Sequence, residues 1–113
     1  MTTRGKKGIP EFVQLRTQHR ILDWAAKERA GKFTRIDVRF RVDYCYIDVY
    51  PGPEDLERNT PIHLCRLRYL GDENRWGFYY YTQAHEKYKR SFLITGDHIG
   101  TPEEAFATAA MFY

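Results

Sequence analysis

Arginine and tyrosine alternate with apolar residues between positions 35 and 50, and these polar side chains are the first candidates for chemistry. If Val42 and Asp43 form a two-residue loop, the two runs pair as a β-hairpin with positions 36/49, 38/47 and 40/45 on one buried face. Guanidinium groups bind phosphates, and exposed aromatic rings stack on bases. The opposite face of the hairpin then carries Arg35, Asp37, Arg39, Arg41, Tyr44, Tyr46, Asp48 and Tyr50.

A later strand extends this polar face if its odd-numbered residues 65, 67 and 69 point into the core. We predict a nucleic-acid interface, to DNA or RNA, on this face. The alternative is that arginines stack on cross-strand tyrosines only to cover the solvent side of the sheet. Asp37 and Asp48 oppose a bound anion and favour that alternative. The candidate binding residues on the sheet are Arg39, Arg41, Tyr44, Tyr46, Arg66 and Arg68.

The four histidines and two cysteines raise the questions of metal binding and catalysis. His63 and Cys65 are predicted to share a strand face, with Cys45 nearby, but the sequence offers no fourth ligand and no CxxC pair. We therefore predict no metal and no cofactor. Both thiols alternate into the apolar face, so neither is a candidate nucleophile. A nuclease can combine a histidine with an arginine, but no spacing singles one out, so a small hydrolase or nuclease is the third candidate.

Positive charge is concentrated in the N-terminal third of the chain. Residues 1–32 hold eight Lys or Arg against three acids, while the whole chain has a net charge of +3. Such a bias suggests an anionic partner, with nucleic acid ahead of a membrane surface. The further candidate phosphate contacts are Arg4, Lys6 and Lys7 in an N-terminal arm, and Arg16, Arg20 and Lys27 on a helix.

That helix is predicted from Pro10 or Glu11 to Ala30, with Gly31 ending it. Its core-facing stripe is predicted to contain Phe12, Leu15, His19, Leu22, Ala26 and Ala30, which recur at steps of three and four. A separate apolar arc holds Val13, Ile21 and Trp24. This arc is either a contact patch for a protein partner or a second copy of the chain, or a surface covered by the sheet or by the 51–61 connection.

The remaining elements follow from turn and capping signals. Strands are predicted at about 62–70, 76–82 and 88–94, and Thr101, Pro102 and Glu104 begin a C-terminal helix. The order α-β-β-β-β-β-α predicts an α+β fold, with an antiparallel meander of four to five strands flanked by an N-terminal and a C-terminal helix. We expect residues 1–9 to form a flexible basic arm and 10–113 a single domain.

An α-β-β-β-α succession of this kind resembles the double-stranded-RNA-binding domain, although only in topology. That family carries a basic cluster at the start of its C-terminal helix, where this chain has Glu103 and Glu104, so phosphate binding there is disfavoured. No signal peptide or membrane span is evident, and the two cysteines are typical of reduced thiols, so we expect a cytoplasmic location and no membrane partner.

The function predicted from the sequence is a small non-enzymatic module that binds nucleic acid. It would use the basic arm, the first helix and the arginine- and tyrosine-bearing sheet face. The alternative is a protein-interaction or accessory domain, including a homodimer, that uses the apolar arc of the first helix.

Overall fold

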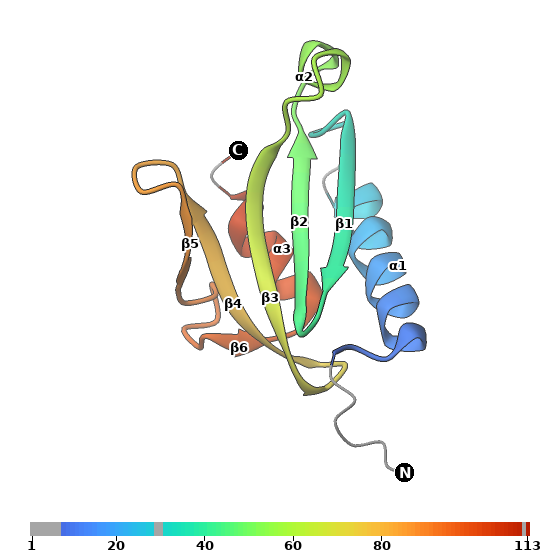
Figure 1. Ribbon diagram of the computed structural model, residues 1–113, viewed down its shortest axis with the longest axis vertical. Coiled ribbons are helices and arrows are strands. Elements are labelled where there is room, and N and C mark those ends of the chain that lie inside the picture. Colours follow the sequence, from blue (N-terminus) through green and yellow to red (C-terminus); the bar gives the residue numbers. More distant parts are fainter. Residues whose placement is uncertain (1–7, 29–30, 112) are drawn as a thin grey trace.

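The computed structural model describes residues 8–28, 31–111 and 113, and it has the α+β order that the sequence predicts (Figure 1). Arg4, Lys6 and Lys7 of the predicted arm lie outside the described residues. In chain order the elements are α1 (Glu11–Glu28), β1 (Arg35–Arg41), β2 (Tyr44–Tyr50), α2 (Pro53–Glu57), β3 (Ile62–Asp72), β4 (Arg75–Thr82), β5 (Lys87–Arg90), β6 (Ile99–Gly100) and α3 (Pro102–Ala110).

The sheet is the predicted antiparallel meander, with strand order β1-β2-β3-β4-β5. Two differences concern its last part. The strand predicted at 88–94 ends at Arg90, and the short strand β6 pairs with β4 as a sixth strand. The connection at 51–61, predicted as a loop, contains the short helix α2, which begins with Pro53 after Gly52.

The hairpin of β1 and β2 has the predicted register at every pair, from Arg41 opposite Tyr44 to Arg35 opposite Tyr50. Its loop is the predicted two-residue turn at Val42 and Asp43. Val42 adopts a φ of 54°, a left-handed conformation that is unfavourable for a β-branched residue. The alternation of side chains along both strands therefore decides the register, even though the turn residues are poorly suited to it.

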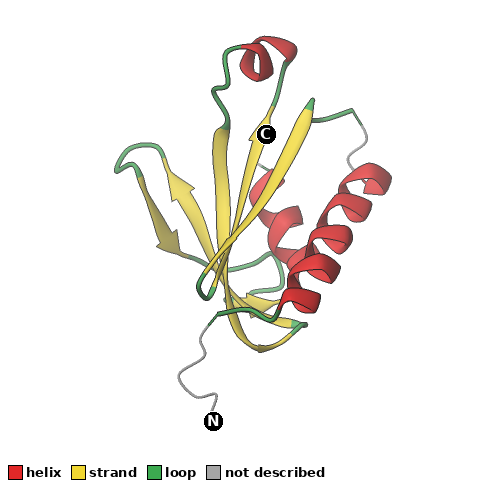
Figure 2. Cartoon of the chain, turned by 45° about the vertical axis from the view of Figure 1, so that its right-hand side comes forward, coloured by secondary structure: helices red, strands yellow, loops and turns green. Residues whose placement is uncertain are grey.

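Both α1 and α3 pack on one side of the sheet, and the core lies between the sheet and these two helices (Figure 2). Alternate residues of the three central strands supply this face of the sheet. Ile9, the last residue of the predicted arm, is also part of the core, and its backbone N–H donates to the carbonyl of Val42 at 3.1 Å. The buried side chains of the central strands include Cys45, Ile47, Val49, Cys65, Leu67, Trp76 and Phe78.

The predicted core stripe of α1 is wrong. Phe12 and Leu15 are 55% and 58% exposed, and His19 and Ala26 are also exposed. The buried residues follow a strict four-residue spacing instead: Val13, Thr17, Ile21 and Ala25. These residues pack against α3 and the sheet. No helix among the described residues is long and apolar enough to cross a membrane.

Candidate nucleic-acid interface

The side of the sheet away from the two long helices, which we call the open face, carries most of the sheet's polar side chains. Residues that pair across antiparallel strands lie on the same side, so the register defines its membership. It contains Arg35, Asp37, Arg39, Arg41, Tyr44, Tyr46, Asp48, Tyr50, His63, Arg66, Arg68, Tyr79, Tyr81, Tyr88 and Arg90. The six sheet residues predicted as binding candidates are therefore brought together on one face.

One row of this face alternates arginine and tyrosine across all five strands of the meander. Successive pairs join Arg39 to Tyr46, Tyr46 to Arg66, Arg66 to Tyr79, and Tyr79 to Arg90. The row runs perpendicular to the strands, so each cation has an aromatic ring beside it. We call these five residues the Arg/Tyr row.

Arg66 lies in the middle of the row, within a group of tyrosines. Its Cζ is 4.2 Å from the ring centroid of Tyr44, 5.0 Å from that of Tyr79 and 5.2 Å from that of Tyr88. These distances are those of cation–π contacts. Its Nε is buried and has no hydrogen-bond partner in the described structure. The rings thus fix the guanidinium without using its hydrogen-bond donors.

The two aspartates of the open face are both neutralised by neighbours. Asp37 accepts a hydrogen bond from Arg35 Nε at 2.7 Å. Asp48 is buried, and its two oxygens are held separately, Oδ2 by Arg39 Nη2 at 2.9 Å and Oδ1 by His63 Nδ1 at 3.0 Å. The acids expected to oppose an anion therefore face it as members of ion pairs or hydrogen bonds.

Tyr88 lies beside both a member of the Arg/Tyr row and His63. Its ring centroid lies 5.6 Å from that of Tyr46, 5.1 Å from that of Tyr81 and 6.4 Å from that of His63. Burial raises the pKa of the Tyr88 phenol, and the charge of Asp48 raises that pKa further. The phenol therefore keeps its proton at neutral pH and adds no negative charge to the face.

Arg41 and Arg68 complete the positive part of the open face. They flank Tyr44 in the register, and both are exposed. Within residues 8–28, 31–111 and 113, neither has a hydrogen bond or an ion pair. Both side chains are therefore available to a ligand.

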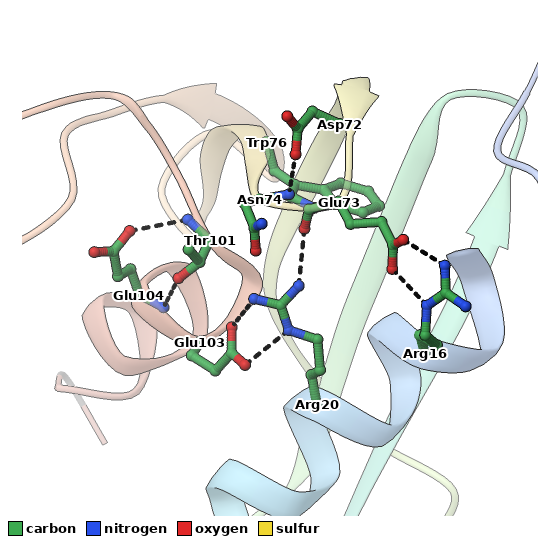
Figure 3. Close-up of polar contacts among 9 residues, drawn as sticks. All are labelled: Arg16, Arg20, Asp72, Glu73, Asn74, Trp76, Thr101, Glu103 and Glu104. Carbon is green, nitrogen blue, oxygen red and sulfur yellow. Dashed lines mark hydrogen bonds and ion pairs between the residues drawn. The ribbon is translucent and has the colours of Figure 1, made fainter. Parts of the chain in front are cut away.

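The basic residues predicted on the first helix are in a different situation, because each is paired with a carboxylate, and the pairs of Arg16 and Arg20 join α1 to other elements (Figure 3). Arg16 Nε donates to Glu73 at 2.8 Å. Arg20 forms a two-pronged pair with Glu103 at 2.8 and 2.7 Å, and it also donates to the Glu73 carbonyl at 3.0 Å. Lys27 pairs with Asp23 one turn away at 3.1 Å. All three side chains already have carboxylate partners on the helical side of the molecule.

The apolar arc predicted as a protein contact is part of the core. Val13 and Ile21 are buried, and the half-buried ring of Trp24 lies edge-on to Phe106 of α3, with centroids 5.8 Å apart. The prediction of an exposed patch at these residues is therefore wrong. The fold covers them, but the ring that meets Trp24 comes from α3, which neither alternative named. The four-residue spacing of Val13, Thr17 and Ile21 is the sequence signal that identifies this core face.

The prediction that His63 and Cys65 share a face is also wrong. The pairing of β2 with β3 shifts between Ile47 and Asp48, which is a β-bulge. As a result Leu64 and Cys65 are both buried, and His63 lies on the open face beside Asp48. No group of three or more metal-ligating side chains occurs in the described part of the chain. Sequence alternation alone does not contain this bulge, so it misses the Asp48–His63 pair.

The helix α3 takes the place of the C-terminal helix of double-stranded-RNA-binding domains in the order of elements. Its N-terminus is occupied by the chain's own side chains. Thr101 caps it, with Glu104 completing the capping box, and Glu103 binds Arg20. Comparisons with protein-family models, with curated proteins and with solved structures found no match.

Proposed function

We propose that this protein binds single-stranded nucleic acid on the open face of its sheet. The observation that carries the proposal is the Arg/Tyr row, which places arginines and tyrosines alternately across five strands on a side that no long helix covers. An unpaired strand offers the two features that match such a row. Its phosphates pair with guanidinium groups, and its bases stack on aromatic rings.

The charge balance of the open face supports this proposal. Six arginines share the face with only two aspartates, and these are engaged by Arg35, Arg39 and His63. Arg41, Arg66, Arg68 and Arg90 have no carboxylate partner among the described residues. Excess positive charge of this kind draws a phosphate backbone to the surface and makes its binding salt-dependent.

The tyrosines favour a single strand over a duplex. Their rings lie between the arginines on a sheet surface, and a base reaches such a ring with its flat side only when it is not stacked in a helix. Stacking contributes about 1–3 kcal/mol per base and tolerates any base, so we expect weak sequence preference. A duplex would meet only the arginines.

Fluorescence anisotropy with labelled single strands of RNA and DNA at low ionic strength tests the proposal. We expect Arg41→Ala combined with Arg68→Ala to weaken binding at least several-fold, since two unpaired phosphate contacts are lost. Lys27→Ala is the matched control, because that lysine lies on α1 and pairs with Asp23. Absence of binding to every single strand at low salt would overturn the proposed function.

A further inference from the structure

The pair of Asp48 and His63 has the geometry of a carboxylate that orients a general base. The Asp48 side chain is 7% exposed, and that of His63 is 43% exposed. With Asp48 Oδ1 3.0 Å from His63 Nδ1, a neutral imidazole carries its proton on Nδ1 and directs it at the carboxylate. The lone pair of Nε2 is then free, and Nε2 has no hydrogen-bond partner in the described part of the chain.

Two arginines contact the neighbours of this imidazole. Arg39 shares the Asp48 carboxylate and keeps half of its side chain exposed, so part of its guanidinium can still meet a ligand. The second arginine is Arg66, which shares the neighbour Tyr88 with His63. The buried Nε of Arg66 lacks a partner, and such unpaired donors are uncommon in folded proteins. Arg66 as a whole is only partly buried, so a phosphate bound beside His63 would meet the terminal nitrogens of its guanidinium and not this Nε.

We propose that the open face cleaves single-stranded RNA, with His63 as the general base. This inference rests on the proposed function, since the strand must first bind to the face. The aromatic rings of Tyr81 and Tyr88 beside the imidazole provide stacking surfaces for the base next to the cleaved bond.

The reaction is an internal transfer of the phosphoryl group that consumes no water. His63 Nε2 takes the proton of a ribose 2′-hydroxyl, and the 2′ oxygen forms a bond to the adjacent phosphorus. The bond from phosphorus to the 5′ oxygen of the next nucleotide breaks, and that oxygen takes a proton from solvent. The products are a 2′,3′-cyclic phosphate and a 5′-hydroxyl, and the imidazolium then returns its proton to solvent.

Each neighbour of His63 has a defined part in this step. Arg66 and Arg39 stabilise the negative charge that develops on the phosphoryl oxygens in the transition state. Asp48 is a positioning residue: it holds the imidazole in the required tautomer and stabilises the imidazolium that forms.

The experiment uses a labelled single-stranded RNA and the same sequence as DNA, with the purified wild-type protein. We expect both strands to bind but only the RNA to be cut, because DNA lacks the 2′-hydroxyl. Mass spectrometry of the fragments should find cyclic phosphate and 5′-hydroxyl ends. We expect His63→Ala to lower the cleavage rate by about 10²–10⁴-fold while RNA affinity stays within about twofold.

Two further variants separate catalysis from folding. Free imidazole should restore part of the rate of His63→Ala, which a merely structural role would not allow. Asp48→Asn should lower the rate at saturating RNA, because the amide no longer fixes the tautomer of His63. Asp48 also holds Arg39, so RNA affinity is measured separately, and the loss of rate should exceed any loss of affinity. His85→Ala is the matched control, since this exposed histidine lies in the turn between β4 and β5, and its rate should equal that of the wild type.

The outcomes distinguish the two proposals. RNA that binds and stays intact would overturn the cleavage proposal and leave the proposed function standing. RNA that fails to bind would overturn the cleavage proposal, and failure of the DNA strand to bind as well would overturn the proposed function too. Equal cleavage by the wild type and by folded His63→Ala would also overturn the inference, because the activity would not belong to this imidazole.

Discussion

The buried thiols of Cys45 and Cys65 give a pH-dependent stability that can be measured. Burial raises the pKa of both thiols, and Cys45 and Asp48 raise that of Cys65 further. In the unfolded chain a cysteine has a pKa of about 8.5, so above this pH the unfolded state binds fewer protons than the folded state. The thiols' contribution to stability is full below about pH 8.5 and falls as the pH rises toward the raised folded pKa, by up to about 1.4 kcal/mol per pH unit for each thiol.

Urea unfolding between pH 8 and pH 10 checks this prediction. The free energy of unfolding of the wild type should decrease over this range more steeply than that of a variant with Cys45→Ala and Cys65→Ala. The absolute stability of that variant will be lower because the substitutions leave cavities, so the comparison concerns slopes. Parallel slopes would contradict the prediction. Neither thiol of the folded protein should react with a disulfide reagent until urea is added.

At the scale of single residues, the sequence identified the arginines and tyrosines of the open face but not the state of their charges. Alternation along a strand tells which residues share a face, and Arg39, Arg41 and Tyr46 follow directly from it. It does not tell which acid binds which base. The burial of Asp48 between Arg39 and His63 depends on a bulge opposite residue 48, and a bulge changes the face of a residue without changing the composition of the strand.

At the scale of elements, the turn of the first hairpin is a place where the chain can be improved. Val42 has a φ of 54° and a side chain that is mostly exposed, so its side chain contributes little packing. Asparagine tolerates this left-handed conformation far better than a β-branched residue. We expect Val42→Asn to raise the free energy of unfolding by roughly 1 kcal/mol, as measured by the urea midpoint.

A suitable control for this substitution is Val38→Asn in the same hairpin. Val38 has its side chain packed against the core, so the same chemical change there should destabilise the protein. An equal or lower stability of Val42→Asn than of the wild type would mean that the turn relaxes its strain in some other way.

Arg20 links three elements, and this link makes it the most important of the helical basic residues. It joins α1 to Glu103 of α3 and to the carbonyl of Glu73 in the turn between β3 and β4 (Figure 3). Burial disfavours the ionised form of Glu103, but the hydrogen bonds from Arg20, Thr101 and the backbone, together with the charge of Arg20, lower the pKa of this carboxyl. We expect Arg20→Ala to cost about 1–2 kcal/mol in urea unfolding, within the range for partly buried charged hydrogen bonds.

The acid dependence gives an independent readout of the same link. The stability from Glu103 is complete above the unfolded carboxyl pKa of about 4.3 and is lost as the pH falls through the lowered folded pKa. Arg20→Ala should therefore flatten the loss of stability in this range. Lys27→Ala, which removes an exposed pair, should change neither the midpoint at pH 7 nor the acid limb. If Arg20→Ala, like Lys27→Ala, changed neither the urea midpoint at pH 7 nor the loss of stability in acid, the role of Arg20 would be contradicted.

The helices and strands were largely predictable from the sequence, but the buried face of α1 was not. Turn and capping residues marked the ends of most elements, and local chemistry decides those. Which face of a helix enters the core depends on the whole surface that it meets. Phe12 and Leu15 are the larger apolar residues, yet the helix turns Val13, Thr17 and Ile21 inward. In this rotation Arg16 and Arg20 reach their carboxylates.

At the scale of the whole molecule, the basic residues on the two sides of the sheet differ in their partners. On the helical side Arg16, Arg20 and Lys27 have carboxylate partners, whereas Arg41, Arg66, Arg68 and Arg90 of the open face have none among the described residues. The net charge of +3 does not distinguish these groups. The ion-pair partners of the basic residues distinguish the two groups. The arginines without a carboxylate partner lie on the open face, beside the tyrosines.

This division predicts the salt dependence of nucleic-acid binding. A single strand that meets four arginines should give a slope of log K against log salt of about −3, at about −0.7 per phosphate contact. Arg41→Ala with Arg68→Ala should reduce the slope to about −1.4, because half of the contacts are lost. Lys27→Ala should leave it unchanged, since its pair with Asp23 lies on the helical side. If Lys27→Ala flattened the slope and the double variant did not, the strand would bind the helical side, and the open face would serve only to cover the sheet.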